Sequence, residues 1–267
     1  MDASAISGFN GSQTALIQPE AMSGLNGDTF VAFSGNAIGG LTADHVSNLP
    51  SDIFTQSDGS PNLSAIEQIA ALQPEAVAGL SLEHIDHIPG DAPGPWDPIF
   101  EAHEGSDIGA VLTADQISNF QSHIVGEHLN SDVIAALSPE AASGISGDVM
   151  VSIDPEDMSG FTAEHIEALP DDAFSAINDV KLENLDPSAM SAFTAEDIDA
   201  LYSGASRGLT AEQFENIPTE ALSGFDSYDI NLLRPDVIEV MDSASLNAMD
   251  ASAISGFNGS QTALIQP

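Results

Sequence analysis

The chain has no cysteine and only three basic residues, and both shortages limit what it can do. Without cysteine it forms no disulfides, thiolate metal sites or cysteine nucleophiles. Lys181, Arg207 and Arg234 stand against 42 acidic residues, which leaves a formal net charge of −39. That charge repels the phosphates of nucleic acids and the headgroups of anionic lipids. We therefore predict that the protein does not bind nucleic acid.

Long apolar runs and catalytic motifs are also missing from the sequence. No apolar run approaches the length of a membrane span, and no basic segment followed by an apolar stretch marks a signal peptide. We find no phosphate loop, dinucleotide fingerprint or nucleophile elbow. We therefore predict a protein that is not an enzyme, with no catalytic residues, no cofactor and no membrane span in this stretch.

What the chain does contain is a repeat of eight residues. From Leu129 onward an apolar residue recurs at every eighth position, and a second usually follows five positions later. The octads FTAEHIEA, from Phe161, and LTAEQFEN, from Leu209, show apolar residues at positions one and six. These two positions are predicted to form the core. The predicted core residues include Phe161, Ile166, Leu169, Phe174, Phe193, Ile198, Leu209, Phe214, Phe225 and Phe257.

Each octad carries the start and stop signals of a one-turn helix. Position two is often Thr, Ser, Asp or Asn, which cap helix N-termini, and position three is often Pro or Ala. Positions one and six then correspond to the pair that forms a hydrophobic staple. An acid at position four faces the positive end of the helix dipole. Position eight is usually Gly or another small residue, which we expect to leave the helix in a left-handed conformation.

A single helical turn is unstable alone, so each octad must be held by its neighbours. We therefore predict an all-α solenoid of one-turn helices with an eight-residue repeat. The alternative is a β-solenoid, which is disfavoured because apolar spacings of five and three break strand alternation. Phenylalanine recurs at position one of every fourth octad from Phe161 to Phe257, which suggests four octads per superhelical turn.

The octads are part of a larger repeat. The stretch MDASAISGFNGSQTALIQP occupies residues 1–19 and again residues 249–267, an offset of 248 residues or 31 octads. A further copy can therefore follow without a phase error. We expect residues 1–267 to form a single continuous solenoid cut from a longer array, with residues 249–267 starting the next copy. Met1 then stands at a repeat position rather than at a translation start.

Two stretches disturb the octad interval. The interval from Leu49 to Leu72 is one residue short of three octads, and residues 50–71 are predicted to be irregular. Residues 89–111 contain Pro89, Pro93, Pro95 and Pro98, which predicts a proline-rich loop insertion. Trp96 lies within it and is the candidate for a loop contact with a partner.

Acidic residues at position four suggest contact with cations. If equivalent positions stack, their carboxylates form a ladder of oxygen ligands that suits a hard cation such as calcium, bound diffusely. No EF-hand loop or glycine-aspartate nonapeptide is present, so the sequence predicts no defined calcium site. The candidate metal contacts are Glu140, Asp148, Glu156, Glu164, Asp172 and the pair His84 and His87, three residues apart on one helical face.

The octads LTADHVSNLPSDIF, LQPEAVAGL, FTAEHIEALPDDAF and LTAEQFENIPTEALSGF resemble the Leu-Thr-x-Glu-Gln and Pro-x-Glu-Ala-Phe arrays of very large bacterial surface and secreted proteins. This resemblance implies an extracellular or cell-surface location and an adhesin-like or filament-forming role. We expect a structural protein, a segment of an extracellular filament that self-associates or continues along the chain. The alternative is a binding module that recognises a partner protein, a glycan or a cell surface.

Overall fold

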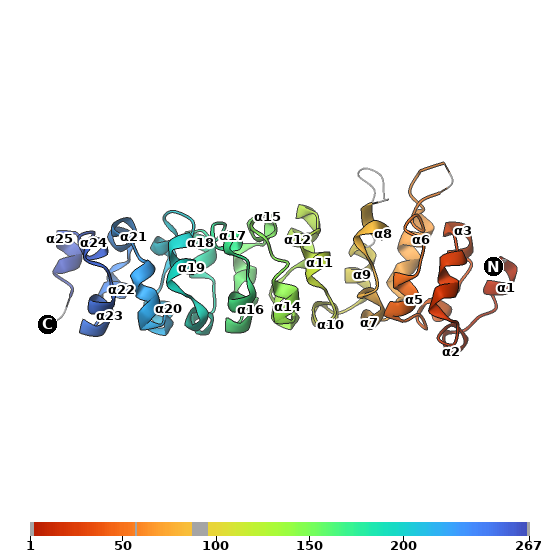
Figure 1. Ribbon diagram of the computed structural model, residues 1–267, viewed down its shortest axis with the longest axis horizontal. Helices are drawn as coiled ribbons and strands as arrows, with labels where there is room; N and C mark the ends of the chain where they lie inside the picture. Colours follow the sequence, from red (N-terminus) through yellow and green to blue (C-terminus); the bar gives the residue numbers. More distant parts are fainter. Residues whose placement is uncertain (1–2, 57, 87–95, 266–267) are drawn as a thin grey trace. The chain divides into compact units, whose positions relative to one another are not determined.

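The computed structural model describes residues 3–56, 58–86 and 96–265 (Figure 1). These residues form short α-helices and 3-10 helices, and their only β pairing is an isolated bridge between Thr55 and Pro61. The prediction of an all-α fold is therefore confirmed, and a β-solenoid is excluded for this part of the chain. Among the same residues, no helix combines the length and the apolar character that crossing a membrane requires.

The chain divides into two compact units, Met1–Asn119 and Phe120–Pro267. The division follows Asn119, next to the one interval of nine residues, from Phe120 to Leu129, that interrupts the octads. Each unit is compact by itself, and the single continuous solenoid stays a prediction.

The helices of the first unit are α1 (Ala3–Ile6), α2 (Gly11–Thr14), η1 (Pro19–Gly24), α3 (Gly27–Phe30), α4 (Gly35–Ile38), α5 (Ala43–Ser47), α6 (Leu63–Gln68), η2 (Ile69–Ala71), α7 (Pro74–Val77), α8 (Leu82–Asp86), α9 (Trp96–Ala102), α10 (Gly105–Gly109) and α11 (Ala114–Ile117). Those of the second unit are α12 (Ser122–His128), α13 (Ser131–Ala136), α14 (Pro139–Ala142), α15 (Gly147–Ser152), η3 (Pro155–Gly160), α16 (Ala163–Ala168), α17 (Asp171–Phe174), α18 (Asp179–Glu183), η4 (Pro187–Ala192), α19 (Ala195–Ala200), η5 (Ala205–Gly208), α20 (Ala211–Asn216), η6 (Thr219–Gly224), α21 (Ser227–Leu232), α22 (Pro235–Val240), α23 (Ser243–Ala248), α24 (Ala251–Ile254) and α25 (Gly259–Thr262).

Helices begin where the octad pattern predicts. Thr162, Thr194 and Thr210, each at position two, are the N-caps of α16, α19 and α20, and each side chain accepts a hydrogen bond from the backbone N–H three residues later. This bond satisfies one of the N–H groups that a helix leaves free at its start. Each of these helices then ends at position eight, because the next position-one residue, such as Leu169 after α16, has extended backbone angles.

Position eight is small for a different reason from the one expected. In the described residues, only Gly59 and Gly204 have positive φ, so the glycines at position eight do not leave their helices in a left-handed conformation. A Cβ on Gly160 would overlap the backbone oxygen of Ser131, and one on Gly224 would overlap that of Ala195. Glycine is required at these positions because another part of the backbone passes too close for a side chain.

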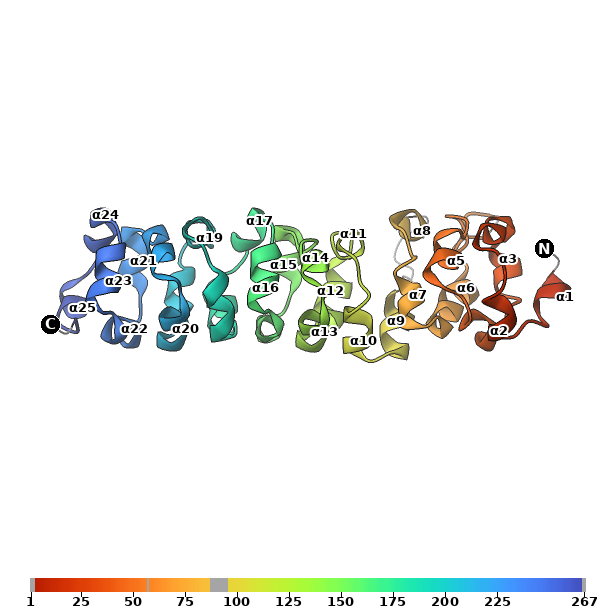
Figure 2. The same ribbon diagram turned by 60° about the horizontal axis from the view of Figure 1, so that its bottom comes forward.

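Helices contact each other at intervals of three octads. In the second unit, α14 contacts α16, and α20 contacts α22, and each partner begins three octads later (Figures 1 and 2). In the first unit, α2 contacts α4 at the same interval. The interval of four octads suggested by the phenylalanine spacing is therefore wrong.

Positions one and six supply most of the buried core. Phe161, Ile166, Leu169, Phe174, Phe193, Ile198, Leu209, Phe214 and Phe225 are buried, whereas Phe257 is half-buried. Phe174 and Phe193 stack edge-to-face with ring centroids 5.6 Å apart. Phe174 stands at position six of one octad, and Phe193 stands at position one of the octad three further on. The contacts that pack the core thus join octads that are three apart.

The two irregular stretches differ in structure. Within residues 50–71, a turn at Gly59 precedes α6, whose first turn is capped by the side chain of Asn62. Within residues 89–111, the described part begins at Trp96 and forms helices α9 and α10. The expected loop is therefore absent from residues 96–109, where the proline at position 98 falls inside the first turn of α9 and is tolerated there.

Candidate functional site

The interior of the protein contains a set of polar side chains at position five of the octads. Gln213, in α20, is 1% exposed and accepts a hydrogen bond at Oε1 from the N–H of Thr210, 3.0 Å away. Its Nε2 donates to the carbonyl oxygens of Leu182, at 2.6 Å, and Leu185, at 2.7 Å. One side chain thus completes its own helix cap and bonds its octad to the octads three and four earlier.

Histidine at position five forms equivalent hydrogen bonds in other octads. His165 accepts a hydrogen bond at Nδ1 from the N–H of Thr162, 3.2 Å away, and its Nε2 lies 2.8 Å from the carbonyl oxygen of Leu137. Because a backbone N–H only donates, Nδ1 is the acceptor and Nε2 carries the proton. A neutral imidazole therefore places an acceptor and a donor where glutamine has its amide oxygen and nitrogen.

The same position-five arrangement recurs in both units. The buried side chains that take part are His45, His84, Gln116, His165, Gln213 and Gln261. This set, which we name the position-five row, was not predicted from the sequence. Its signal was the choice of His or Gln as the fifth residue of the LTADH, LTADQ, FTAEH and LTAEQ octads, since both offer an acceptor and a donor at similar reach, although the FTAED octad at residues 193–197 has Asp there.

His84 was a candidate metal contact, and the structure places it in the position-five row. Its Nδ1 accepts from the N–H of Ser81 at 3.0 Å, and its Nε2 lies 2.9 Å from the carbonyl oxygen of Leu49. Both ring nitrogens are engaged, so His84 has none left for a metal. Its expected partner His87 lies outside the described residues.

At position five of its octad, Lys181 places an ammonium group where other octads have the amide of glutamine or the ring of histidine. It is 4% exposed, and its Nζ donates to the carbonyl oxygen of Ile153 and lies 3.5 Å from that of Val151. Burial lowers the pKa of the Lys181 ammonium, and the carboxylate of Asp154 opposes this shift. The chain thus buries its only lysine against backbone oxygens alone, with no carboxylate bonded to it among the described ion pairs.

An open groove lies beside Lys181 in the second unit. Its volume is about 630 Å³, and Asp148, Asp172 and Asp179 line it together with Tyr202, whose side chain is 57% exposed. The carboxylate of Asp172 accepts a hydrogen bond from the N–H of Gly147, 2.8 Å away. The groove therefore joins an exposed aromatic ring to several hydrogen-bond acceptors, the combination that polar ligands with many hydroxyl groups require.

The acidic residues expected to contact cations lie on the surface. The side chains of Glu140, Asp148, Glu156, Glu164 and Asp172 are all exposed. Asp148 and Asp172 belong to octads three apart, as do Glu140 and Glu164, which is the interval at which helices contact each other. Diffuse calcium binding stays a prediction.

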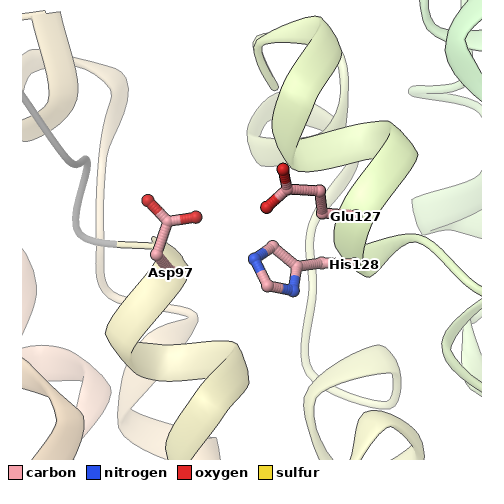
Figure 3. A group of neighbouring side chains, drawn as sticks. All are labelled: Asp97, Glu127 and His128. Carbon is pink, nitrogen blue, oxygen red and sulfur yellow. The ribbon is translucent and has the colours of Figure 1, made fainter. Parts of the chain in front are cut away.

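Figure 3 draws three further side chains that carry metal-ligating atoms, Asp97, Glu127 and His128. Asp97 belongs to α9 of the first unit, and Glu127 and His128 are adjacent residues at the end of α12 in the second. Neither unit by itself supplies three ligands from this group, whereas calcium prefers six to eight oxygens.

Trp96 does not lie in an exposed loop. It begins α9, is 3% exposed, and its ring centroid lies 6.4 Å from that of Phe100. The candidate loop contact is therefore part of the core of the first unit. The tryptophan stands on the octad interval, and it is buried like other position-one residues.

The comparisons with known proteins do not indicate a function, so the function is proposed from the residues of this chain. A scan of protein-family models found no match to this chain, and a search among curated proteins found no similar sequence. The resemblance to bacterial surface arrays rests on the octads alone. The position-five row and the groove beside Lys181 are the two features from which a function is argued.

Proposed function

We propose that this chain is a structural protein, a segment of an extracellular filament or surface fibre built from tandem repeats and folded as a solenoid of short helices. The observation that carries the proposal is a separation that recurs along the chain. Position five bonds to a carbonyl 28 residues earlier in His45–Ile17, His165–Leu137, Gln213–Leu185 and Gln261–Leu233. The separation is 35 residues in His84–Leu49 and 36 residues in Gln116–Leu80, whose intervals include the two irregular stretches.

A recurring separation supports indefinite extension. In the regular part of the chain, position-five side chains bond to octads three and four before their own, and the acceptors are backbone oxygens that every residue has. Such a chain is stabilised by nearest-neighbour contacts, as in other solenoid proteins, and it grows without a new kind of contact. The duplicated stretch at residues 1–19 and 249–267 keeps the octad phase and supports extension by whole repeats.

The charge supports a location outside the cell. With a net charge of −39, the repeats repel each other and stay soluble at high local concentration, provided that dissolved cations screen them. Extracellular fluids supply sodium and calcium for this purpose. The absence of cysteine fits a fibre whose strength comes from repeated noncovalent contacts.

Electron microscopy of native material tests the proposal. We expect uniform fibres that an antibody against this chain decorates at regular intervals. The intact polypeptide should also be several times longer than the chain described here, which mass spectrometry or gel electrophoresis of the native chain measures. Native material that consists of discrete particles with a chain of this length alone contradicts the proposal.

A second candidate function is a binding module for glycans, favoured by the groove that contains Tyr202. Concave sites with an exposed aromatic ring and a few polar groups are common ligand sites. A glycan array with this chain tests this function, with Tyr202→Ala as the variant that loses binding. Tyr228, which is 51% exposed but does not line the groove, is the control position.

A further inference from the structure

The two copies of the duplicated stretch have the same sequence but different surroundings. In the first copy, Ile6 and Thr14 are fully buried, whereas the equivalent Ile254 is half-buried and Thr262 is exposed. All four stand at position six of their octads. Since the sequences are identical, the difference comes from what covers each copy.

The opposite sides of the two copies show the reverse pattern. Ala5 and Gln13, at position five, are exposed in the first copy. The equivalent Ala253 is fully buried, and Gln261 is 5% exposed with its Nε2 bonded to the carbonyl oxygen of Ile230. Position five thus faces the preceding octads, and position six faces the following ones. Each copy has one covered side and one open side, and the open sides are complementary.

The first copy identifies what covers the position-six side. Helix α1 contacts α3, and α2 contacts α4, so residues 27–38 supply the cover. The N–H of Gly11 donates to Oδ1 of Asn36 at 3.0 Å, and the carbonyl oxygen of Ile17 lies 2.8 Å from Nε2 of His45. In the first copy, α3 and α4 therefore cover this surface, and Asn36 and His45 form hydrogen bonds with it.

In the second copy the same surface is an open apolar cavity of about 480 Å³. The residues that line it are Leu246, Ile254, Ser255, Phe257, Thr262 and Ile265. Most of this lining is apolar, and the equivalents of Ile254 and Thr262 in the first copy are buried. An apolar surface of this kind gains stability when another apolar surface removes it from water.

We propose that the cavity formed by Leu246, Ile254, Phe257, Thr262 and Ile265 is the docking surface for the equivalents of α3 and α4 in the copy of the repeat that begins at Met249 of the same chain. The proposal rests on the proposed function, because it assumes tandem copies. In this contact, the N–H of Gly259 donates to the equivalent of Asn36 in that copy, and the carbonyl oxygen of Ile265 accepts from the equivalent of His45. We call this contact between residues 249–265 and the residues that follow them the junction. The second copy thus continues with the packing that the first copy shows.

A single cysteine tests the junction, because the natural chain has none that would compete. The Ile254→Cys change is made in the present chain and at residue 254 of a tandem chain in which residues 1–248 precede a complete second copy. The measured quantity is the rate of thiol modification by a maleimide. We expect the thiol at position 254 to react at least tenfold more slowly in the tandem chain, at a rate close to that of Ile6→Cys in the present chain.

Ser252→Cys is the matched control, because Ser252 does not line the cavity, and it and its equivalent Ser4 are both exposed. It should react at the same rate in both chains. Hydrogen exchange of the unsubstituted chains gives a second measurement, with amides 251–265 at least tenfold slower in the tandem chain. Equal rates for Ile254→Cys in the two chains, together with equal amide exchange, overturn the proposal.

A separate chain is the other possible occupant of the cavity. In that case, protection of the Ile254→Cys thiol in the present chain rises with protein concentration and is no greater in the tandem chain. This outcome assigns the surface to an intermolecular contact and also overturns the proposal.

Failure of the junction and failure of the proposed function are distinguishable. Fibres in native material, together with a thiol at position 254 that stays reactive in the tandem chain, mean that repeats are joined flexibly, so only the junction is wrong. A protected thiol at that position without native fibres means that the repeats stack but do not build a filament.

Discussion

Gln213 and Leu185 are joined by a hydrogen bond of 2.7 Å from the amide nitrogen of the side chain to the backbone carbonyl oxygen. His165 and Leu137 stand in the same relationship at 2.8 Å, with the same separation along the chain. Two chemically different side chains thus form one kind of link. The protein requires an acceptor and a donor at set positions, and it accepts either residue that provides them.

This equivalence predicts that His165→Gln is nearly neutral. Glutamine keeps both bonds, so the free energy of unfolding should change by less than about 0.5 kcal/mol. His165→Leu leaves the N–H of Thr162 and the carbonyl of Leu137 buried without partners, which should cost about 2 kcal/mol or more. Urea unfolding measures both changes, and Gln213→His is the reciprocal control. Equal stabilities of the Leu and Gln variants would show that these bonds contribute nothing.

Lys181→Gln should stabilise the second unit by about 1 kcal/mol near neutral pH, because glutamine adds the missing bond to the N-cap and removes a buried charge. Burial lowers the pKa of Lys181, so the unfolded chain binds its proton more tightly than the folded one. The natural chain therefore gains stability as pH rises from the lowered folded pKa to the unfolded value of about 10.4.

The advantage of Lys181→Gln should accordingly shrink as pH rises toward that value. Urea unfolding at a series of pH values measures the trend. Arg207→Gln removes a charge from a mostly exposed side chain and controls for the change in net charge. An advantage that stays constant with pH would contradict the assignment of the effect to the buried ammonium.

Gly224→Ala should destabilise the second unit by about 2 kcal/mol, because the new Cβ overlaps the backbone oxygen of Ala195 and the backbone must move. Gly126→Ala is a control in the same unit. It lies in α12 with its nearest Cβ neighbour at 3.6 Å, so it should gain about 0.5–1 kcal/mol of helix propensity. Gly24 stands at the same octad position as Gly224 but has open space around it. Similar thermal melts for Gly224→Ala and Gly24→Ala would refute the close approach as the reason for glycine.

Added cations should stabilise the protein. At about 0.15 M salt the screening length is roughly 8 Å, so carboxylates that lie within this distance of each other still repel. The position-four acids of contacting helices, such as Asp148 in α15 and Asp172 in α17, are the candidates for this repulsion. The melting temperature should rise with sodium and more steeply with calcium, because a divalent ion between two carboxylates relieves more repulsion than sodium does. Melting curves at fixed pH with chelator, sodium and calcium measure this. Flat melting temperatures across the series would mean that the acids are too far apart to interact.

Local features of the fold could be predicted from the sequence, because their causes lie within one octad. Thr162 and Thr210 cap helices three residues from the N–H groups that they bind. The interval of three octads could not be predicted, since every octad carries similar apolar residues and the sequence does not specify which ones meet. The recurrence of phenylalanine at every fourth octad pointed to a contact interval that the packing does not use.

The role of glycine at position eight was misassigned for a related reason. A glycine after a short helix ordinarily indicates a left-handed residue, which is a local cause. At Gly160 the cause is the backbone of Ser131, more than three octads earlier in the chain, and no pattern near Gly160 reveals it. The position-five row was missed likewise, because a glutamine at the start of a helix looks like a surface residue until its distant acceptor is known.

The use of backbone carbonyls as acceptors for the position-five row has a consequence for evolution. A bond to a backbone oxygen does not depend on the side chain of the partner residue, so this bond does not restrict the sequence of the octad that supplies the oxygen. Unequal recombination between near-identical gene segments that adds or removes whole multiples of eight codons therefore yields a product that still folds. A change of one or two codons outside the irregular stretches does not. Variants that differ in length by whole octads are therefore compatible with this hydrogen bond.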